Sequence, residues 1–205
     1  EIFNVPEYEN PNKWVTADEY LSGNVREKLR IAEQFAKADP KFETNVKYLK
    51  EVQPQDLSAS EISVRLGSTW IPSEDIEDFV FELLNPSYYV KQNINIQYVD
   101  STSEWYVKGK NYDKYNVKVN STYGTSRANA YKIIEDTLNL KDVRIYDYHE
   151  DENGKKIAEL NKKETAIAQA KQEQIKVAFE EWIWKDPERR DRLTKMYNEK
   201  FNSIR

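Results

Sequence analysis

Lysine and aromatic side chains alternate along one stretch in the middle of the chain, "EWYVKGKNYDKYNVKV" at residues 104–119. Lysines can neutralise the phosphates of a nucleic acid and aromatic rings can stack on its bases, so the combination favours nucleic-acid binding. The residues expected to make these contacts are Lys108, Lys110, Lys114, Lys118, Trp105 and Tyr112. The alternative is structural, because lysines on an exposed edge strand also protect a sheet from mispairing.

Arginines provide a second group of basic residues. Arg189, Arg190 and Arg192 lie near the start of the last predicted helix, and Arg127 lies upstream at the start of another. Arginine is well suited to phosphate because its planar guanidinium can donate two parallel hydrogen bonds. We therefore expect Arg127 to join the lysine stretch and the three later arginines to form a second patch. A solvated helix face is the alternative for that patch.

Other chemistry has little support in the sequence. The chain has five glycines and neither a Walker-type loop nor a dinucleotide-binding fingerprint. His149 is the one histidine and no serine lies in a nucleophile elbow, which argues against acyl transfer. The absence of cysteine excludes disulfides and thiolate zinc sites. We expect no catalytic residue, no cofactor site and no metal site in this chain.

The composition narrows the possible partners. The net charge is -5, with 33% charged and 13% aromatic residues, so any DNA contact requires a local basic patch. No apolar run is long enough for a membrane span, and the first residues do not have the order of a signal peptide. We expect a cytoplasmic protein without membrane contact. Because the sequence starts without Met and stops on a basic segment, we expect it to be a fragment of a larger protein.

The basic residues must be positioned by a succession of helices and short strands. After an irregular lead-in over 1–17, helical spacing predicts a helix that begins after Asn24, followed by helices over 42–53 and 73–84. A period of two then predicts strands over 94–99, 104–109 and 115–119.

The second half of the chain begins with a predicted helix capped by Ser126. A hairpin turning at Asn153-Gly154 follows, then a long helix that begins after Asn161 and a further helix that restarts at Pro187. The expected fold is α+β, with an N-terminal helical part, a small and mostly antiparallel sheet with one helix, and long C-terminal helices. We expect a helical subdomain over 1–90 and an α+β subdomain over 91–205, which could also form one compact unit.

Several segments resemble one segment of very large phage and conjugative-element proteins. These segments are "YLSGNVREKL" (20–29), "LGSTWIP" (66–72), "TYGTSRANAYKIIEDTLNL" (122–140) and "KQEQIKVAFEEWIWKDPERRDRLTKMYNEKFNSIR" (171–205). The large proteins join an adenine-specific DNA methyltransferase to a Swi/Snf-like superfamily-two helicase. The resemblance implies that this chain is the connector preceding the helicase motor.

The resemblance also implies where catalysis would lie. ATP and S-adenosylmethionine would be bound by the flanking regions, because "NPSYYV" at 85–90 has Ser87 where the methyltransferase motif has its second proline. The expected function is a non-catalytic accessory domain in DNA processing, such as restriction, modification or protection of mobile DNA. It would position DNA or couple the catalytic regions. The alternative is a protein-interaction module that docks on the flanking regions without touching DNA.

Overall fold

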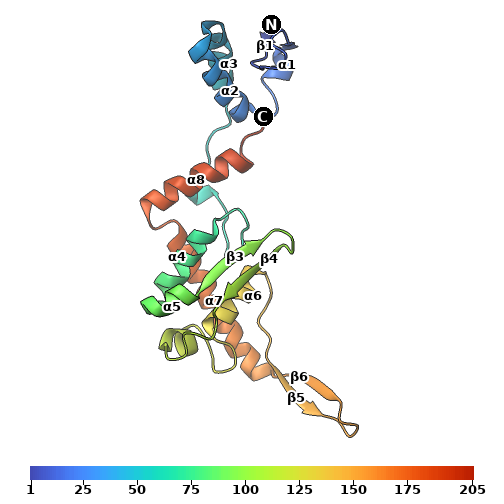
Figure 1. Ribbon diagram of the computed structural model, residues 1–205, viewed down its shortest axis with the longest axis vertical. Helices are drawn as coiled ribbons and strands as arrows, with labels where there is room; N and C mark the ends of the chain where they lie inside the picture. The colour runs from blue at the N-terminus through green and yellow to red at the C-terminus, as the bar shows by residue number, and fades with distance from the viewer. The chain divides into compact units, whose positions relative to one another are not determined.

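The chain has an α+β fold in a computed structural model that describes all residues from 1 to 205 (Figure 1). It divides into two compact units, one formed by 1–62 together with 190–205 and the other by 63–189. This division differs from the expected boundary near residue 90. Helix α4 (Ser73–Leu84) packs on strand β3 (Asn95–Val99) and helix α7 (Lys162–Ile183), so it belongs with the sheet residues.

The first unit combines a short hairpin with several helices. Its elements are β1 (Ile2–Asn4), β2 (Trp14–Thr16), α1 (Ala17–Tyr20), α2 (Val25–Ala38), η1 (Pro40–Phe42), α3 (Glu43–Glu51), η2 (Ala59–Glu61) and most of α8 (Pro187–Phe201). Phe3 of β1 stacks on Tyr20, and both pack in the core with Val25, Ala32 and Leu49. The irregular lead-in expected over 1–17 is therefore wrong in part, because residues 2–4 and 14–16 pair as antiparallel strands, whereas the Pro-containing loop between them is irregular as expected.

The stretch 20–29 has a structural role in this unit. The Asn24 side chain accepts a hydrogen bond from the Glu27 amide at 3.0 Å and caps α2, which confirms the expected helix start. Lys28 donates to three backbone carbonyls, those of Glu19, Tyr20 and Ser22. Gly23 exchanges two backbone hydrogen bonds with Arg205, so this turn also holds the end of the chain.

The second unit contains the longest helix and two hairpins. Its elements are α4, α5 (Tyr88–Asn93), β3, β4 (Glu104–Lys108), η3 (Lys118–Thr122), α6 (Ala130–Leu138), β5 (Tyr146–Glu150), β6 (Lys156–Leu160), α7 and the first turn of α8. The core lies between α4, α6 and α7. Phe79 and Phe179 meet edge to face with ring centroids 5.1 Å apart, and Ile133 and Ile175 are fully buried.

The third strand expected over 115–119 is wrong. The β3–β4 pair stands alone, and the segment forms a helical turn that includes η3. In a strand Tyr115, Val117 and Val119 would share one face. Instead Tyr115 and Val117 are 98% and 70% exposed while Val119 is fully buried. Side-chain hydrogen bonds from Asn120 to the carbonyls of Lys114 and Asn116 stabilise this turn in place of strand pairing.

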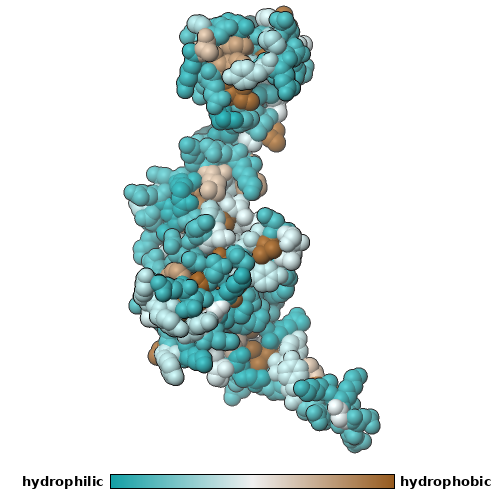
Figure 2. All heavy atoms as spheres, viewed as in Figure 1, coloured by the Kyte–Doolittle hydropathy of each residue, from teal (hydrophilic) through white to brown (hydrophobic).

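The β5–β6 hairpin was correctly expected, and Asn161 caps α7 as expected by accepting from the Glu164 amide. The connection between β5 and β6 is longer than a two-residue turn, because Glu150 pairs with Lys156. Within this connection only Gly154 has a positive φ. The expected Ser126 cap is wrong: α6 begins three residues later, where Asn129 accepts from the Lys132 amide. Figure 2 shows that hydrophilic residues cover most of the hairpin. None of the helices combines the length and apolar character that crossing a membrane requires.

Candidate nucleic-acid interface

A polar cavity of about 580 Å³ lies in the second unit, between the segment that follows β4 and the start of α6. Four cationic side chains line it, those of Lys110, Lys114, Arg127 and Lys132. Between them are hydroxyl and amide groups, which come from Thr125, Ser126, Asn111, Asn120 and Asn129. No carboxylate and no aromatic ring is among the lining residues. The lining therefore offers hydrogen-bond donors and positive charge to a negatively charged group.

The side of the cavity next to α6 is formed by a tight turn before the helix. Thr125 accepts hydrogen bonds from the amides of Arg127 and Ala128 through its hydroxyl oxygen. Asn129 caps α6 and donates to the Lys110 carbonyl at 2.8 Å, which connects the helix start to the end of β4. Gly124 precedes this turn, and a Cβ there would lie 2.0 Å from the Val119 carbonyl oxygen. Only glycine permits this close approach.

The opposite side of the cavity is anchored by a buried carboxylate. The Asp113 carboxylate accepts hydrogen bonds from the Tyr131 hydroxyl at 2.8 Å and from the side-chain amide of Asn116 at 2.9 Å. Burial, together with the bond to Asp113, raises the pKa of Tyr131 far above its usual range, so its hydroxyl keeps its proton and donates. The hydrogen bond between Asp113 and Tyr131 of α6 thus holds the loop that carries Lys114 against this helix.

Three of the four cations are paired with carboxylates that lie behind the lining. Lys110 contacts Glu135 at 2.7 Å, Lys132 contacts Asp136 at 2.8 Å and Arg127 contacts Asp147 at 2.9 Å. Lys114 is exposed and forms no ion pair. The cavity with these partners therefore carries an excess of one positive charge, and its paired cations are held in defined positions.

Lys110 has a more structural role than its neighbours. Its ammonium donates to the Val107 carbonyl as well as to Glu135, and Glu135 also accepts from the Val107 amide. These contacts attach the end of β4 to α6. Lys114, Arg127 and Lys132 remain the side chains best able to reach a ligand.

The other residues of the lysine-aromatic stretch that were expected to contact nucleic acid do not line this cavity. Trp105 is only 2% exposed and packs on Tyr98 with ring centroids 5.4 Å apart, so the expectation that it stacks on bases is wrong. Lys108 and Tyr112 are exposed but do not line the cavity. Lys118 lines a different cavity of about 300 Å³, beside Trp182 and Lys185.

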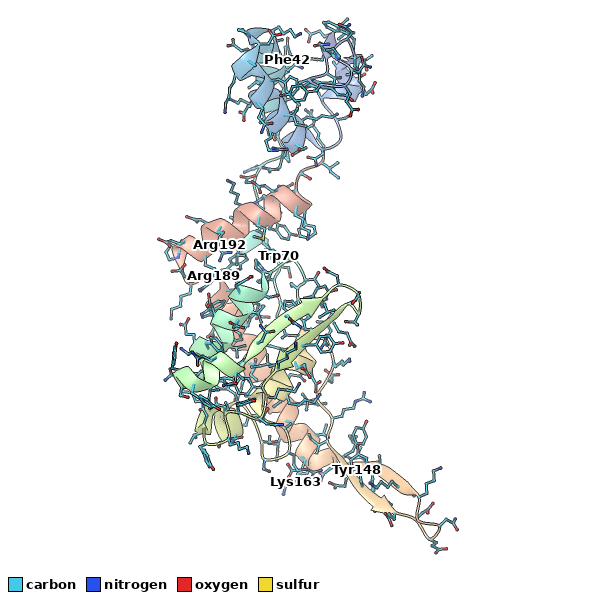
Figure 3. All side chains as sticks on the ribbon, viewed as in Figure 1. Phe42, Trp70, Tyr148, Lys163, Arg189 and Arg192 are labelled. Carbon is cyan, nitrogen blue, oxygen red and sulfur yellow. The ribbon has the colours of Figure 1, made fainter.

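The three later arginines do not all belong to one unit. Arg189 belongs to the second unit, whereas Arg190 and Arg192 belong to the first; Figure 3 labels Arg189 and Arg192 on α8. The Arg189 guanidinium stacks on Trp182 at 3.5 Å and donates to the carbonyls of Trp182 and Ile183. These contacts cap the end of α7. Arg190 and Arg192 also have partners within the chain.

Sequence reasoning missed Lys132 and the polar residues around it. Lys132 lies in the first turn of α6 and was not among the residues expected to bind nucleic acid. The signal that could have identified it is the run Gly124-Thr125-Ser126-Arg127 before the helix. Such a run combines a close backbone approach, hydroxyls and a guanidinium at a helix N-terminus, where anions are favoured.

Residues 65–203 match the model of a family described as "Domain of unknown function (DUF8437)". The match covers more than half of the chain and includes every residue that lines the cavity. No curated protein and no solved structure matches the chain.

Proposed function

The chain belongs to the DUF8437 family, and we propose that it is a non-catalytic accessory domain that positions DNA by its phosphates. Its setting would be a cytoplasmic helicase–methyltransferase protein of a mobile element, in which flanking regions bind ATP and S-adenosylmethionine. The domain would present the DNA backbone to those regions, or couple them, without reading sequence.

The cavity lined by Lys110, Lys114, Arg127 and Lys132 is the observation that supports this proposal most strongly. Cations and hydroxyl or amide donors are the groups that contact phosphate and sugar in nucleic-acid complexes. The lining has no aromatic ring on which an unpaired base could stack. Its chemistry therefore favours contact with the phosphate backbone over stacking on bases.

Fluorescence anisotropy with labelled single-stranded, duplex and forked DNA across a salt series tests the proposal. A site that neutralises one to three phosphates should give a plot of log K against log salt with a slope of about -1 to -3. We expect measurable binding at low salt that weakens with this slope and depends little on sequence. Absence of binding to all three DNA forms at low salt would contradict DNA positioning.

A protein-interaction module is the second candidate function. Tyr88 and Tyr89, at the start of α5, are 77% and 64% exposed, and exposed aromatic residues are enriched where proteins dock. The net charge of -5 also disfavours a general attraction to DNA. The same anisotropy experiment separates the two candidates, since a docking module would not bind any DNA form in a salt-sensitive manner.

A further inference from the structure

Arg127 belongs to two structural features of the second unit. It lines the cationic cavity, and it also reaches the β5–β6 hairpin. Its two terminal nitrogens donate to the Asp147 carboxylate and to the Tyr146 carbonyl, both at 2.9 Å. The same guanidinium therefore connects a candidate anion site with a segment that lies outside the cavity.

The hairpin is weakly supported apart from its base. It consists of two strands with no third partner, and most of its residues are exposed, including Tyr148 at 69%. Figure 1 shows it extending away from the other elements of its unit, and Figure 3 labels Tyr148 on the hairpin. A hairpin of two strands is only marginally stable in water, so its few outside contacts matter.

Asp147 is the hairpin residue held most closely from outside. Its carboxylate accepts from Arg127 on one oxygen and from the Asn161 amide on the other, at 3.0 Å. These hydrogen bonds, that of Arg127 first, hold the pKa of the Asp147 carboxyl below its usual range. The side chain remains 53% exposed, so the ion pair can separate in water at a modest cost.

A phosphate group would compete with this carboxylate. Phosphate and carboxylate oxygens both match the planar donor geometry of a guanidinium, and phosphate in the cavity would also contact Lys114 and Lys132. The Asp147 carboxylate therefore plays the part that a bound phosphate would play, because both are anions that accept from the Arg127 guanidinium.

We propose that Asp147 is an internal competitor for Arg127, so that a phosphate group entering the cavity displaces the carboxylate and frees the β5–β6 hairpin from this contact. The proposal rests on the proposed function, because it concerns the same cavity and the same ligand. Linkage makes the effect reciprocal. A partner that draws the hairpin away from Arg127 would strengthen phosphate binding, which gives a connector domain a physical means of coupling.

Replacing Asp147 with Asn tests the competition. Asp147→Asn keeps the side-chain size and one acceptor oxygen but removes the competing charge. We expect it to raise the affinity for a labelled short single-stranded oligonucleotide about two- to fivefold at low salt, the range expected for an exposed ion pair. The same titration with inorganic phosphate as competitor shows whether a free anion suffices or a strand is needed.

Glu159→Gln is the matched control. Glu159 lies opposite Asp147 on the partner strand of the hairpin, and replacing it removes the same charge without altering a residue that contacts Arg127. The double variant Arg127→Gln with Asp147→Asn should bind no more tightly than Arg127→Gln alone, since Asp147 acts through Arg127. Circular dichroism of each variant establishes that the fold is intact.

The outcomes separate this inference from the proposed function. Tighter binding by Asp147→Asn than by both the parent and Glu159→Gln supports the competition. Equal or weaker binding by Asp147→Asn, with the parent still bound to DNA, overturns the competition and leaves DNA positioning in place. A weaker affinity in particular would show that Asp147 only orients Arg127. If neither the parent nor Asp147→Asn binds DNA, both the competition and the proposed DNA positioning are overturned.

Discussion

Reversing three cavity charges together is expected to abolish DNA binding. The variant combines Lys114→Glu, Arg127→Glu and Lys132→Glu, whose side chains line the cavity and are exposed. Each charge-assisted hydrogen bond to phosphate contributes about 1.5–3 kcal/mol, and each new carboxylate adds repulsion. The affinity at low salt should therefore fall at least about 100-fold, which anisotropy measures directly. Lys110 is left unchanged because it attaches β4 to α6.

The control for this variant has the same change in net charge at other places on the second unit. Lys91→Glu, Lys155→Glu and Lys163→Glu alter exposed residues that do not line the cavity. If the control variant loses as much affinity as the cavity variant, binding depends on the overall charge of the protein and not on this cavity.

Truncating Phe179 is expected to give the largest loss of stability. Phe179 of α7 is fully buried between Phe79 and Trp182, with ring centroids 5.1 and 6.4 Å away. Phe179→Ala removes apolar burial and leaves a cavity that neighbours refill only partly. The free energy of unfolding of the second unit should fall by about 3–5 kcal/mol. Urea unfolding followed by tryptophan fluorescence measures this change.

Val177→Ala is the appropriate comparison for Phe179→Ala, because Val177 lies on the same helix and is 50% exposed. Its unfolding midpoint should stay close to that of the parent. Similar midpoints for Phe179→Ala and the parent would mean that α7 does not pack on α4 as described.

Local signals in the sequence predicted several elements correctly. Asn24 and Asn161 each precede a helical apolar pattern, and both cap a helix through one short-range hydrogen bond. The β5–β6 hairpin follows from alternating residues around Asn153-Gly154. These features depend on residues that lie close together in the chain, three positions apart at the caps and at most 14 apart in the hairpin, which is the range that sequence patterns describe well.

The errors arose where distant residues decide the structure. The alternation in "YNVKV" suggested a strand, but the segment turns: Asn120 bonds to the carbonyls of Lys114 and Asn116, and Asp113 just before the segment accepts from Tyr131, 18 positions away. Trp105 looked available for stacking, and only the β3–β4 register and its packing on Tyr98 show that it is buried. The α+β class was predictable from the order of patterns. The return of residues 190–205 to the first unit was not, because no local pattern records it.

The candidate site was predicted only in part, because residues that are distant in the sequence decide which basic side chains converge. Lys110, Lys114 and Arg127 were identified by residue type, and the fold brings all three to one cavity. Lys132 was missed and Lys118 lies at another cavity, because the path of the chain between β4 and α6 decides which lysines converge. Arg189 was assigned by charge alone, whereas its stacking on Trp182 gives it a structural role.

Mapping the bound phosphate by nuclear magnetic resonance tests the central claim most directly. Backbone amide resonances of the chain are followed while a short single-stranded oligonucleotide is titrated at low salt. We expect the largest shifts at Lys114, at Lys132 and along the turn from Thr125 to Asn129, with shifts in β5 that follow release of Asp147. Shifts confined to other surfaces, or no shifts at all, would contradict the assignment of this cavity as the phosphate site.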